Sequence, residues 1–249
     1  MENKNILLTV AYDGTNYFGW QKQDNVKTIQ GELEKALSKL FKQKIDIRGA
    51  SRTDTGVHSL CQLALLKHKT TIPIDRIPLA INSFLDTKEI IITNAMYVDE
   101  SFHPQNSVYK KTYQYKIYNA NFLNPLLRNY TEFVHKPLNI EKMKQATKYF
   151  LGRHDFKAFC ATGSTAKTTE RTIYYLDIIK EDNIITIEIT GNGFLYNMVR
   201  IIAGTLIDVG LDKKQPEDIE HIILSKDRQK SGKTASASGL TLYKVYFDN

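Results

Sequence analysis

The residues with the clearest chemical potential stand in a short polar loop, residues 49–58, between two apolar segments. Asp54 and Arg52 are two positions apart in this loop, so an extended backbone directs both side chains to the same face. A guanidinium beside a partly buried carboxylate keeps that carboxylate ionised, as a nucleophile or a general base must be. By residue type alone, an aspartate beside threonine in a glycine-bounded loop is more often a turn former or half of a surface ion pair.

Hydrophobic patterns place this loop within an α+β (mixed α/β) protein. Strands are predicted where apolar and β-branched residues cluster or alternate, and helices where apolar residues recur every three to four positions. The predicted strands cover residues 6–12, 44–48, 60–66, 89–97, 111–118, 171–179, 183–190 and 240–247. The predicted helices cover residues 28–40, 74–84, 140–151 with Asn139 as N-cap, 195–209, and a last helix with Pro216 in its first turn.

The order of these elements indicates two α+β halves, residues 1–105 and 106–249, that meet near His103 and Pro104. The chain has 249 residues and a formal net charge of +7, which favours an anionic partner, nucleic acid before an acidic membrane surface. The two cysteines, Cys61 and Cys160, are far apart and form no disulfide framework. No secretory signal and no apolar run of the ~20 residues needed to cross a bilayer is found, so a cytoplasmic protein is expected.

Three motifs that could bind cofactors or metals fail on inspection. Residues 231–234 read SGKT, but Asp227 stands where a phosphate-binding P-loop needs glycine, so a solvated basic loop is expected. Residues 191–193 read GNG and are typical of a turn between a strand and a helix. His58 and Cys61 have no second ligand pair at metal-binding spacing. The sequence therefore predicts no metal and no nucleotide cofactor.

Several blocks together resemble one known family. The loop GASRTDTGVHS is similar to the signature G-x-x-R-T-D-x-G-V-H of the tRNA pseudouridine synthase A family. Residues 12–21 match its YDG…GWQ block, residues 111–115 its K-x-Y-x-Y strand, and residues 194–204 its F-x-x-x-M-V-R-x-x-x-G helix. The segment GLTL at residues 239–242 fits its last strand. The blocks occur in the family order over nearly the whole chain.

The resemblance implies a fold and an activity. The family fold has two related halves that share a central, mostly antiparallel sheet flanked by helices and act as one continuous catalytic unit. Its members isomerise uridine to pseudouridine in the anticodon stem-loop of tRNA, just 3′ of the anticodon (positions 38–40), without cofactor or metal. They act as homodimers with a basic cleft built from both subunits. The expected partners are therefore tRNA and a second copy of the chain, with no membrane.

The resemblance also assigns residues one by one. Asp54 takes the position of the catalytic aspartate, Arg52 that of its ion-pair partner, and Tyr113 that of the tyrosine that lies against the uracil. The expected substrate-binding residues in the matching blocks are Tyr113, Arg200, Lys111, Trp20 and His58. From periodicity alone, Tyr113 equally fits the core face of a strand, and Arg200 a solvated surface charge.

Three alternatives remain open at this stage. The chain could be a paralogue directed at ribosomal RNA, and Thr55 and Ser59, where the family commonly has alanine, do not decide between RNA classes. It could bind RNA without catalysis. It could also be a carboxylate-based glycoside hydrolase, although the loop holds no second acid to pair with Asp54.

Overall fold

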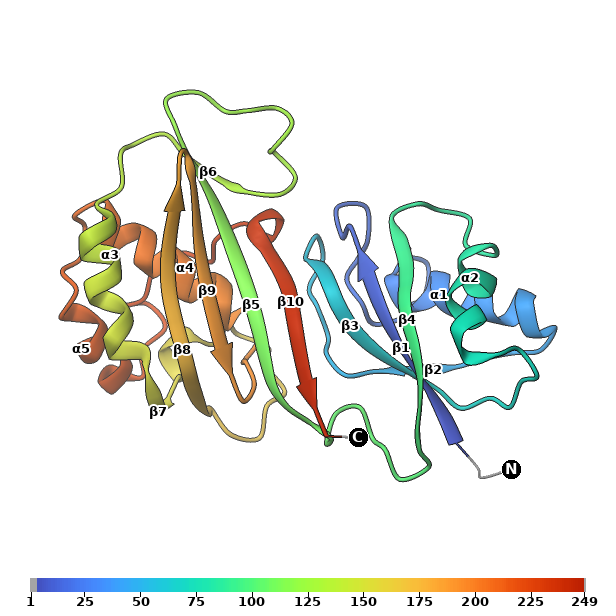
Figure 1. Ribbon diagram of the computed structural model, residues 1–249. Coiled ribbons are helices and arrows are strands. Elements are labelled where there is room, and N and C mark those ends of the chain that lie inside the picture. Colours follow the sequence, from blue (N-terminus) through green and yellow to red (C-terminus); the bar gives the residue numbers. More distant parts are fainter. Residues whose placement is uncertain (1–3, 249) are drawn as a thin grey trace. The chain divides into compact units, whose positions relative to one another are not determined.

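The computed structural model describes residues 4–248 and divides into two compact units (Figure 1). The first unit comprises the residues up to Tyr109 together with those from Leu242 onward, and the second comprises Lys110–Thr241. The chain passes between them within β5 (Val108–Asn119) and within β10 (Leu240–Phe247). Each unit has a sheet with helices packed on it, which confirms the predicted α+β class.

The sheet of the first unit is antiparallel and is built around β1. Its hydrogen-bonded strands follow the order β4, β1, β3, with β2 also paired to β3. The strands are β1 (Lys4–Tyr12), β2 (Ile47–Gly49), β3 (His58–Leu66) and β4 (Ile90–Asp99). The last strand, β10, neighbours β3, where the Ser59 hydroxyl donates to the Leu242 carbonyl at 3.4 Å. The polar loop that carries Asp54 therefore joins β2 to the central strand β3.

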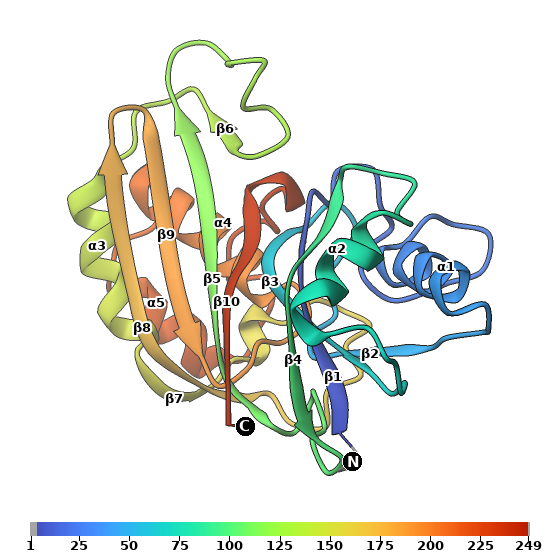
Figure 2. The ribbon, with the colours of Figure 1, turned by 45° about the vertical axis from the view of Figure 1, so that its right-hand side comes forward.

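Helices α1 (Ile29–Phe41) and α2 (Ile77–Asn82), the latter preceded by a 3-10 turn at Ile74–Arg76, lie on one face of this sheet (Figure 2). Thr28 caps α1, because its hydroxyl accepts a hydrogen bond from the Gly31 amide at 3.3 Å. The inward faces of sheet and helices form a core whose members include Leu8, Val10, Leu33, Leu37 and Ile81. Tyr12 and Trp20 of this core contact the polar loop that carries Asp54.

The second unit has an antiparallel sheet in the order β5, β9, β8, β7, with the short strand β6 pairing parallel to β5. These strands are β5, β6 (Glu132–Val134), β7 (Gly152–Asp155), β8 (Glu170–Glu181) and β9 (Ile184–Gly191). The helices are α3 (Ile140–Thr147), α4 (Met198–Gly210) and α5 (Asp218–Ser225), with 3-10 turns at Lys148–Phe150, Lys157–Phe159 and Ala237–Gly239. The three α-helices gather on one face of the sheet (Figure 1).

The sequence predicted most of these elements and missed two strands. Asn139 caps α3 as expected, accepting from the Lys142 amide at 3.1 Å, and the hairpin of β8 and β9 turns at Asp182, whose φ is +52°. Strands β6 and β7 were not predicted, because three or four residues are too few to show a periodicity. The expectation for Pro216 was wrong: it lies in the turn that precedes α5, and Glu217 is the N-cap.

Candidate active site

The polar loop that carries Asp54 is anchored by Thr53, the residue between Arg52 and Asp54. The Thr53 side chain is buried, and its hydroxyl forms a 2.8 Å hydrogen bond with the Tyr12 hydroxyl. Its carbonyl accepts from the Trp20 amide at 3.1 Å. Arg52 is exposed and Asp54 half-buried, so the two flanking side chains face away from the buried one, as in an extended backbone. The loop therefore presents Asp54 outward from a fixed backbone.

The segment of residues 12–21 holds this loop by close backbone contacts. A Cβ on Gly14 would lie 2.0 Å from the Val57 carbonyl oxygen, and a Cβ on Gly19, whose φ is +80°, would lie 2.5 Å from the Thr53 carbonyl oxygen. Only glycine permits both the positive φ and the close approach. These contacts give a structural reason for both glycines of this segment.

His58 fastens the other end of the loop. Its Nδ1 accepts a hydrogen bond from the Gly14 amide at 3.1 Å and also lies 3.1 Å from Asp13 Oδ1. One Nδ1 cannot accept from the amide and donate to the carboxylate at once. The amide always carries its hydrogen, and Asp13 Oδ1 is already bound by the Thr15 amide and hydroxyl, so the bond to Gly14 describes the contact better.

Trp20 lies beneath the loop. The side chain is 1% exposed, belongs to the core of the first unit and stacks obliquely on Tyr12, with ring centroids 6.1 Å apart. A Cβ on Gly49 would lie 2.3 Å from the Trp20 indole nitrogen, so the ring fills the space under the end of β2. A ring with almost no exposed surface cannot stack on a nucleotide, and the geometry gives Trp20 a supporting position.

Arg52 lies two residues before Asp54, and its side chain is exposed. An exposed guanidinium is well solvated, and holding it against a neighbouring carboxylate gains little free energy. The ion pair of Arg52 with Asp54 stays a prediction.

Three of the predicted site residues, Tyr113, Lys111 and Arg200, lie in the second unit. Tyr113 on β5 is 8% exposed, and the Phe194 ring meets it edge-on, with centroids 5.2 Å apart and an interplanar angle of 87°. Lys111, two positions earlier on the same strand, shares its face. Burial lowers the pKa of Lys111 to about 8. An ammonium held in such surroundings gains more from an anionic ligand than one exposed to water does.

Arg200, in the first turn of α4, is held by two hydrogen bonds. Its Nε donates to the Ala235 carbonyl at 2.7 Å, and its Nη1 donates to Asn197 Oδ1 at 2.7 Å. Asn197 is the N-cap of α4 in a left-handed conformation, φ +58°, which asparagine tolerates better than most residues. The side chain is partly buried, so the alternative of a solvated surface charge is wrong.

The segment SGKT is not the solvated loop that the sequence predicted. Ser231 is buried and its hydroxyl donates to the Ala158 carbonyl at 2.8 Å, and the Gly232 amide donates to the Thr205 hydroxyl at 2.8 Å. A Cβ on Gly204 would lie 1.9 Å from the Lys233 carbonyl oxygen. The glycines serve close packing on α4, which periodicity could not reveal.

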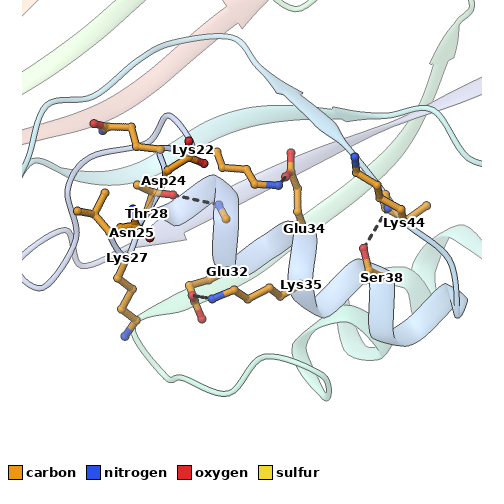
Figure 3. A pocket seen from close by; sticks show the side chains of 14 residues that line it. Lys22, Asp24, Asn25, Lys27, Thr28, Glu32, Glu34, Lys35, Ser38 and Lys44 are labelled. Atoms are coloured by element: carbon orange, nitrogen blue, oxygen red, sulfur yellow. Dashed lines mark hydrogen bonds and ion pairs between the residues drawn. The ribbon is translucent and has the colours of Figure 1, made fainter.

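A separate pocket in the first unit, about 670 Å³, is lined by residues 22–28 and the side of α1 (Figure 3). It contains none of the predicted site residues. Figure 3 shows Lys22 reaching Glu34 and Lys35 reaching Glu32, at 2.8 and 2.7 Å. The charges of its lining thus largely neutralise one another.

No group of three or more His, Cys, Asp or Glu side chains within residues 4–248 is arranged to hold a metal ion. Over the same residues, no helix has the length and apolar character needed to span a bilayer.

Sequence reasoning missed several residues that hold the site. Tyr12 and Thr53 are polar residues buried by their contact; Tyr12 stands in the YDG block and Thr53 in the signature loop, but neither was assigned a role. Asn197 carried a weak signal, since asparagine before a helix is a common cap. Glu132, described below, carried none, because its partners lie 101 and 104 positions further along the chain.

Comparisons with known proteins identify the family of the chain. The sequence model of the tRNA pseudouridine synthase family matches residues 8–105 and 146–248. Proteins called tRNA pseudouridine synthase A from Thermoanaerobacter sp. (strain X514) and Caldicellulosiruptor bescii are 48% and 49% identical to this chain over 244 residues, 98% of this chain and 100% of each relative. The protein of that name from Acetivibrio thermocellus is 48% identical over the same shares.

Among solved structures, a chain in the crystal structure of a Cbf5-Nop10-Gar1 complex aligns with 95% of this chain and 57% of its own length, at 13% identity and a TM-score of 0.39. So low a score adds nothing to the assignment, which rests on the sequence matches over both units. The chain belongs to the tRNA pseudouridine synthase family, isomerases that convert uridine to pseudouridine in tRNA.

Proposed function

We propose that this protein isomerises uridines in the anticodon stem-loop of tRNA, with Asp54 as its catalytic carboxylate. The observation that carries the proposal is the anchored loop: buried Thr53 fixes the backbone, while Asp54 beside it is only half-buried. A fixed backbone holds the carboxylate in position before the substrate arrives, which lowers the entropic part of the barrier. The family assignment supports the reaction, and the resemblance supplies the target within tRNA.

The reaction is an isomerisation that conserves the atoms of the nucleotide. The N1–C1′ bond breaks, the uracil turns, and a C5–C1′ bond forms while the C5 proton leaves to solvent and N1 gains one. Nothing is oxidised or reduced, so no electron carrier takes part. Attack of the carboxylate on C1′, attack on C6, and elimination at the sugar each require an ionised acid fixed beside the nucleotide, and Asp54 supplies it in each case.

Tyr113 is proposed to lie against the uracil, as the resemblance implies. A base within the stem-loop must leave its stack before the carboxylate can reach the sugar, at a cost of a few kcal/mol. Contact with an aromatic ring returns ~1–3 kcal/mol per base, which offsets much of that cost. The edge-on contact with Phe194 fixes the plane of the Tyr113 ring in advance.

The cations are proposed to bind the RNA backbone. Arg200 and Lys111 are partly buried, and Arg52 is exposed beside Asp54, so each suits a phosphate or ribose contact near the target nucleotide. Trp20 and His58 are proposed to act indirectly, by holding the catalytic loop. Residues from both halves of the chain are thus proposed to serve one catalytic unit.

Replacing the catalytic acid tests the proposal. We expect Asp54→Asn to abolish turnover, because the amide is neutral and nearly isosteric, while tRNA affinity stays within a few fold. Tritium release from tRNA containing 5-tritiated uridine measures the turnover, and filter binding measures the affinity. Asp46→Asn, an exposed aspartate near β2 in the same unit, is the matched control. Full tritium release by Asp54→Asn would remove Asp54 from the mechanism.

The same assays separate the alternatives. A non-catalytic RNA-binding module would release no tritium in its intact form, and a glycoside hydrolase would produce free uracil. A paralogue directed at ribosomal RNA would leave tRNA unchanged: mapping pseudouridines in tRNA and rRNA from cells that lack the protein identifies the target. We expect the losses in the anticodon stem-loop alone.

We further propose that the protein works as a homodimer in the cytoplasm, as the resemblance implies. The loop between β5 and β6 exposes Phe122 and Leu126 at 83% and 81%, unusually high values for large apolar side chains. A second copy of the chain is the proposed occupant. Light scattering should give twice the chain mass of 28.6 kDa, and Phe122→Ser with Leu126→Ser should shift that mass toward one chain. An unchanged dimer would place its interface elsewhere.

A further inference from the structure

Arg200 is held from both sides by a single residue of a distant segment. The Ala235 carbonyl accepts the Arg200 Nε–H at 2.7 Å, and the Ala235 amide donates to the Arg200 carbonyl at 3.2 Å. Together with the bond from Nη1 to Asn197, these contacts fix the plane of the guanidinium, which is rigid and planar. The direction in which Arg200 presents its charge therefore depends on where Ala235 lies.

Ala235 belongs to a segment without regular structure. Lys233–Ser236, called here the holding segment, contains neither helix nor strand, so its backbone has no secondary-structure partners of its own. Ala235 is fully buried, with an exposure of 0%. Its position comes from its own backbone bond to Arg200 and from the tertiary contacts of its neighbours in the segment.

Glu132, the first residue of β6, supplies those contacts at both ends of the holding segment. Its Oε1 accepts from Lys233 Nζ at 2.7 Å, and its Oε2 accepts from the Ser236 amide at 2.9 Å. The Tyr115 hydroxyl donates to the Ser236 carbonyl at 2.9 Å and lies 3.4 Å from the same carboxylate. Glu132 is 8% exposed, so its carboxylate binds the Ser236 amide away from water, where such a bond is strong, whereas the Lys233 side chain remains 64% exposed.

The pKa of Tyr115 is shifted by the same surroundings. Burial raises the pKa of its phenol far above the ordinary value, and the nearby Glu132 carboxylate raises it further. The phenol thus stays a hydrogen-bond donor over the whole range in which the protein is handled. The contacts of β5, β6 and the holding segment form one network that ends on Arg200.

We propose that Glu132 is a positioning residue: its carboxylate fixes the holding segment, whose Ala235 carbonyl sets the direction of the Arg200 guanidinium toward the tRNA. The inference rests on the proposed function, in which Arg200 contacts the substrate. Glu132 itself touches neither the substrate nor Asp54 in this scheme. Its effect on the reaction passes through Arg200 alone, and that is what distinguishes it from a general contribution to folding.

A double-mutant cycle tests this route. We expect Glu132→Gln to lower kcat/KM by about as much as Arg200→Ala, at least about tenfold, since a misplaced group loses most of its effect. The double variant should be no worse than Arg200→Ala, because the two changes act on one guanidinium. Asp155→Asn, which removes the 2.8 Å pair between Lys226 and Asp155 in the same unit, is the matched control and should keep full activity.

A spectroscopic readout is independent of turnover. The Arg200 Nε–H signal, identified by its loss in Arg200→Ala, should exchange slowly with solvent in the intact protein and quickly in Glu132→Gln. Lys233→Met is a milder variant for the case in which Glu132→Gln does not fold, because the Lys233 side chain is 64% exposed. It should lower kcat/KM and speed the exchange in the same direction.

Two outcomes overturn the proposal. In one, the folded Glu132 variant keeps its kcat/KM and its slow Arg200 exchange. In the other, the losses of Glu132→Gln and Arg200→Ala multiply in the double variant, which would mean separate routes. Failure of the proposed function is seen separately, since the intact protein would then release no tritium from tRNA before any variant is made.

Discussion

The side chain of Thr53 turns inward between two residues that are more exposed, so the loop presents Arg52 and Asp54 and not Thr53 at its surface. The Thr53 hydroxyl is bound by the Tyr12 hydroxyl and the Thr53 carbonyl by the Trp20 amide. Both the side chain and the backbone of the residue before Asp54 are therefore held. Ordinary loops are mobile because their backbone groups bind water. This one is held by groups of the core, and a carboxylate on it stays in one place.

Gly19 offers a test of how much that fixation matters. We expect Gly19→Ala to lower the free energy of unfolding by roughly 2–4 kcal/mol and to lower turnover sharply, because a Cβ would meet the Thr53 carbonyl oxygen at 2.5 Å on a residue with φ +80°. Urea denaturation and tritium release are the measurements.

Gly163 is the matched control. Its φ is +87°, but a Cβ there would have no atom within 4 Å. Gly163→Ala should therefore show only the strain of the left-handed conformation, roughly 1–2 kcal/mol, with turnover kept. Equal losses in the two variants would mean that the close approach to Thr53 adds nothing.

Lys111 gives stability a dependence on pH. Its pKa in the folded protein is about 8, below the usual 10.4 or so of the unfolded chain, so the unfolded state binds more protons between those values. Stability is therefore reduced below pH 8 and recovers as the pH rises. We expect the intact protein to gain roughly 1–2 kcal/mol relative to Lys111→Met between about pH 7.5 and 9.5. Urea denaturation at several pH values measures this. If the free energy of unfolding depends on pH in the same way in both proteins, the pKa of Lys111 is not lowered.

At the scale of elements, α4 and the loop that follows α5 form one packed pair. Gly204 and Gly232 face each other so closely that a Cβ on Gly232 would lie 2.6 Å from the Gly204 carbonyl carbon. The Thr205 hydroxyl binds the Gly232 amide. The helix that carries Arg200 is thereby joined to the segment that holds its guanidinium, so the packing of two elements controls one side chain.

Gly204 and Gly210, both in α4, should differ in their response to the same substitution. Gly204→Ala should lose roughly 2–3 kcal/mol of stability, because its Cβ would meet the Lys233 carbonyl oxygen at 1.9 Å and backbone cannot easily move. Gly210→Ala meets mainly the flexible Met143 side chain, at 2.7 Å, and gains helix propensity of about 1 kcal/mol, so it should be near neutral.

Thermal unfolding and tritium release measure both variants. Gly204→Ala should also lower kcat/KM, because the displaced Lys233 carries the holding segment with it. Full activity in a folded Gly204→Ala protein would show that the packing of α4 against Lys233 does not affect the position of Arg200.

For the molecule as a whole, the net charge of +7 has one measurable consequence. Each phosphate that a lysine or arginine neutralises releases counterions, so the logarithm of the tRNA affinity should fall linearly with the logarithm of the salt concentration. With several contacts we expect at least about a tenfold loss between ~50 and ~200 mM salt. Filter binding measures it. A flat response would argue against binding through the RNA backbone.

Much of this architecture follows from local sequence. The periodicities predicted the main strands and helices, and Asn139 was recognisable as a helix N-cap. The ordered sequence blocks, among them the one around Asp54, indicated a family that the comparisons confirm. These signals are local because an amphipathic face or a capped helix end needs only its own few residues to be recognised. The block around Asp54 is likewise a single continuous stretch.

Tertiary structure alone decided which distant groups meet. Arg52 turned out to be exposed, Trp20 to be buried under the loop, and the SGKT segment to be packed against α4. Glu132 reaches a segment more than a hundred positions away. The type of a residue determines which bonds its side chain can form. Which of these bonds exist depends on burial and on partners far away in the sequence, and both are set only when the chain folds.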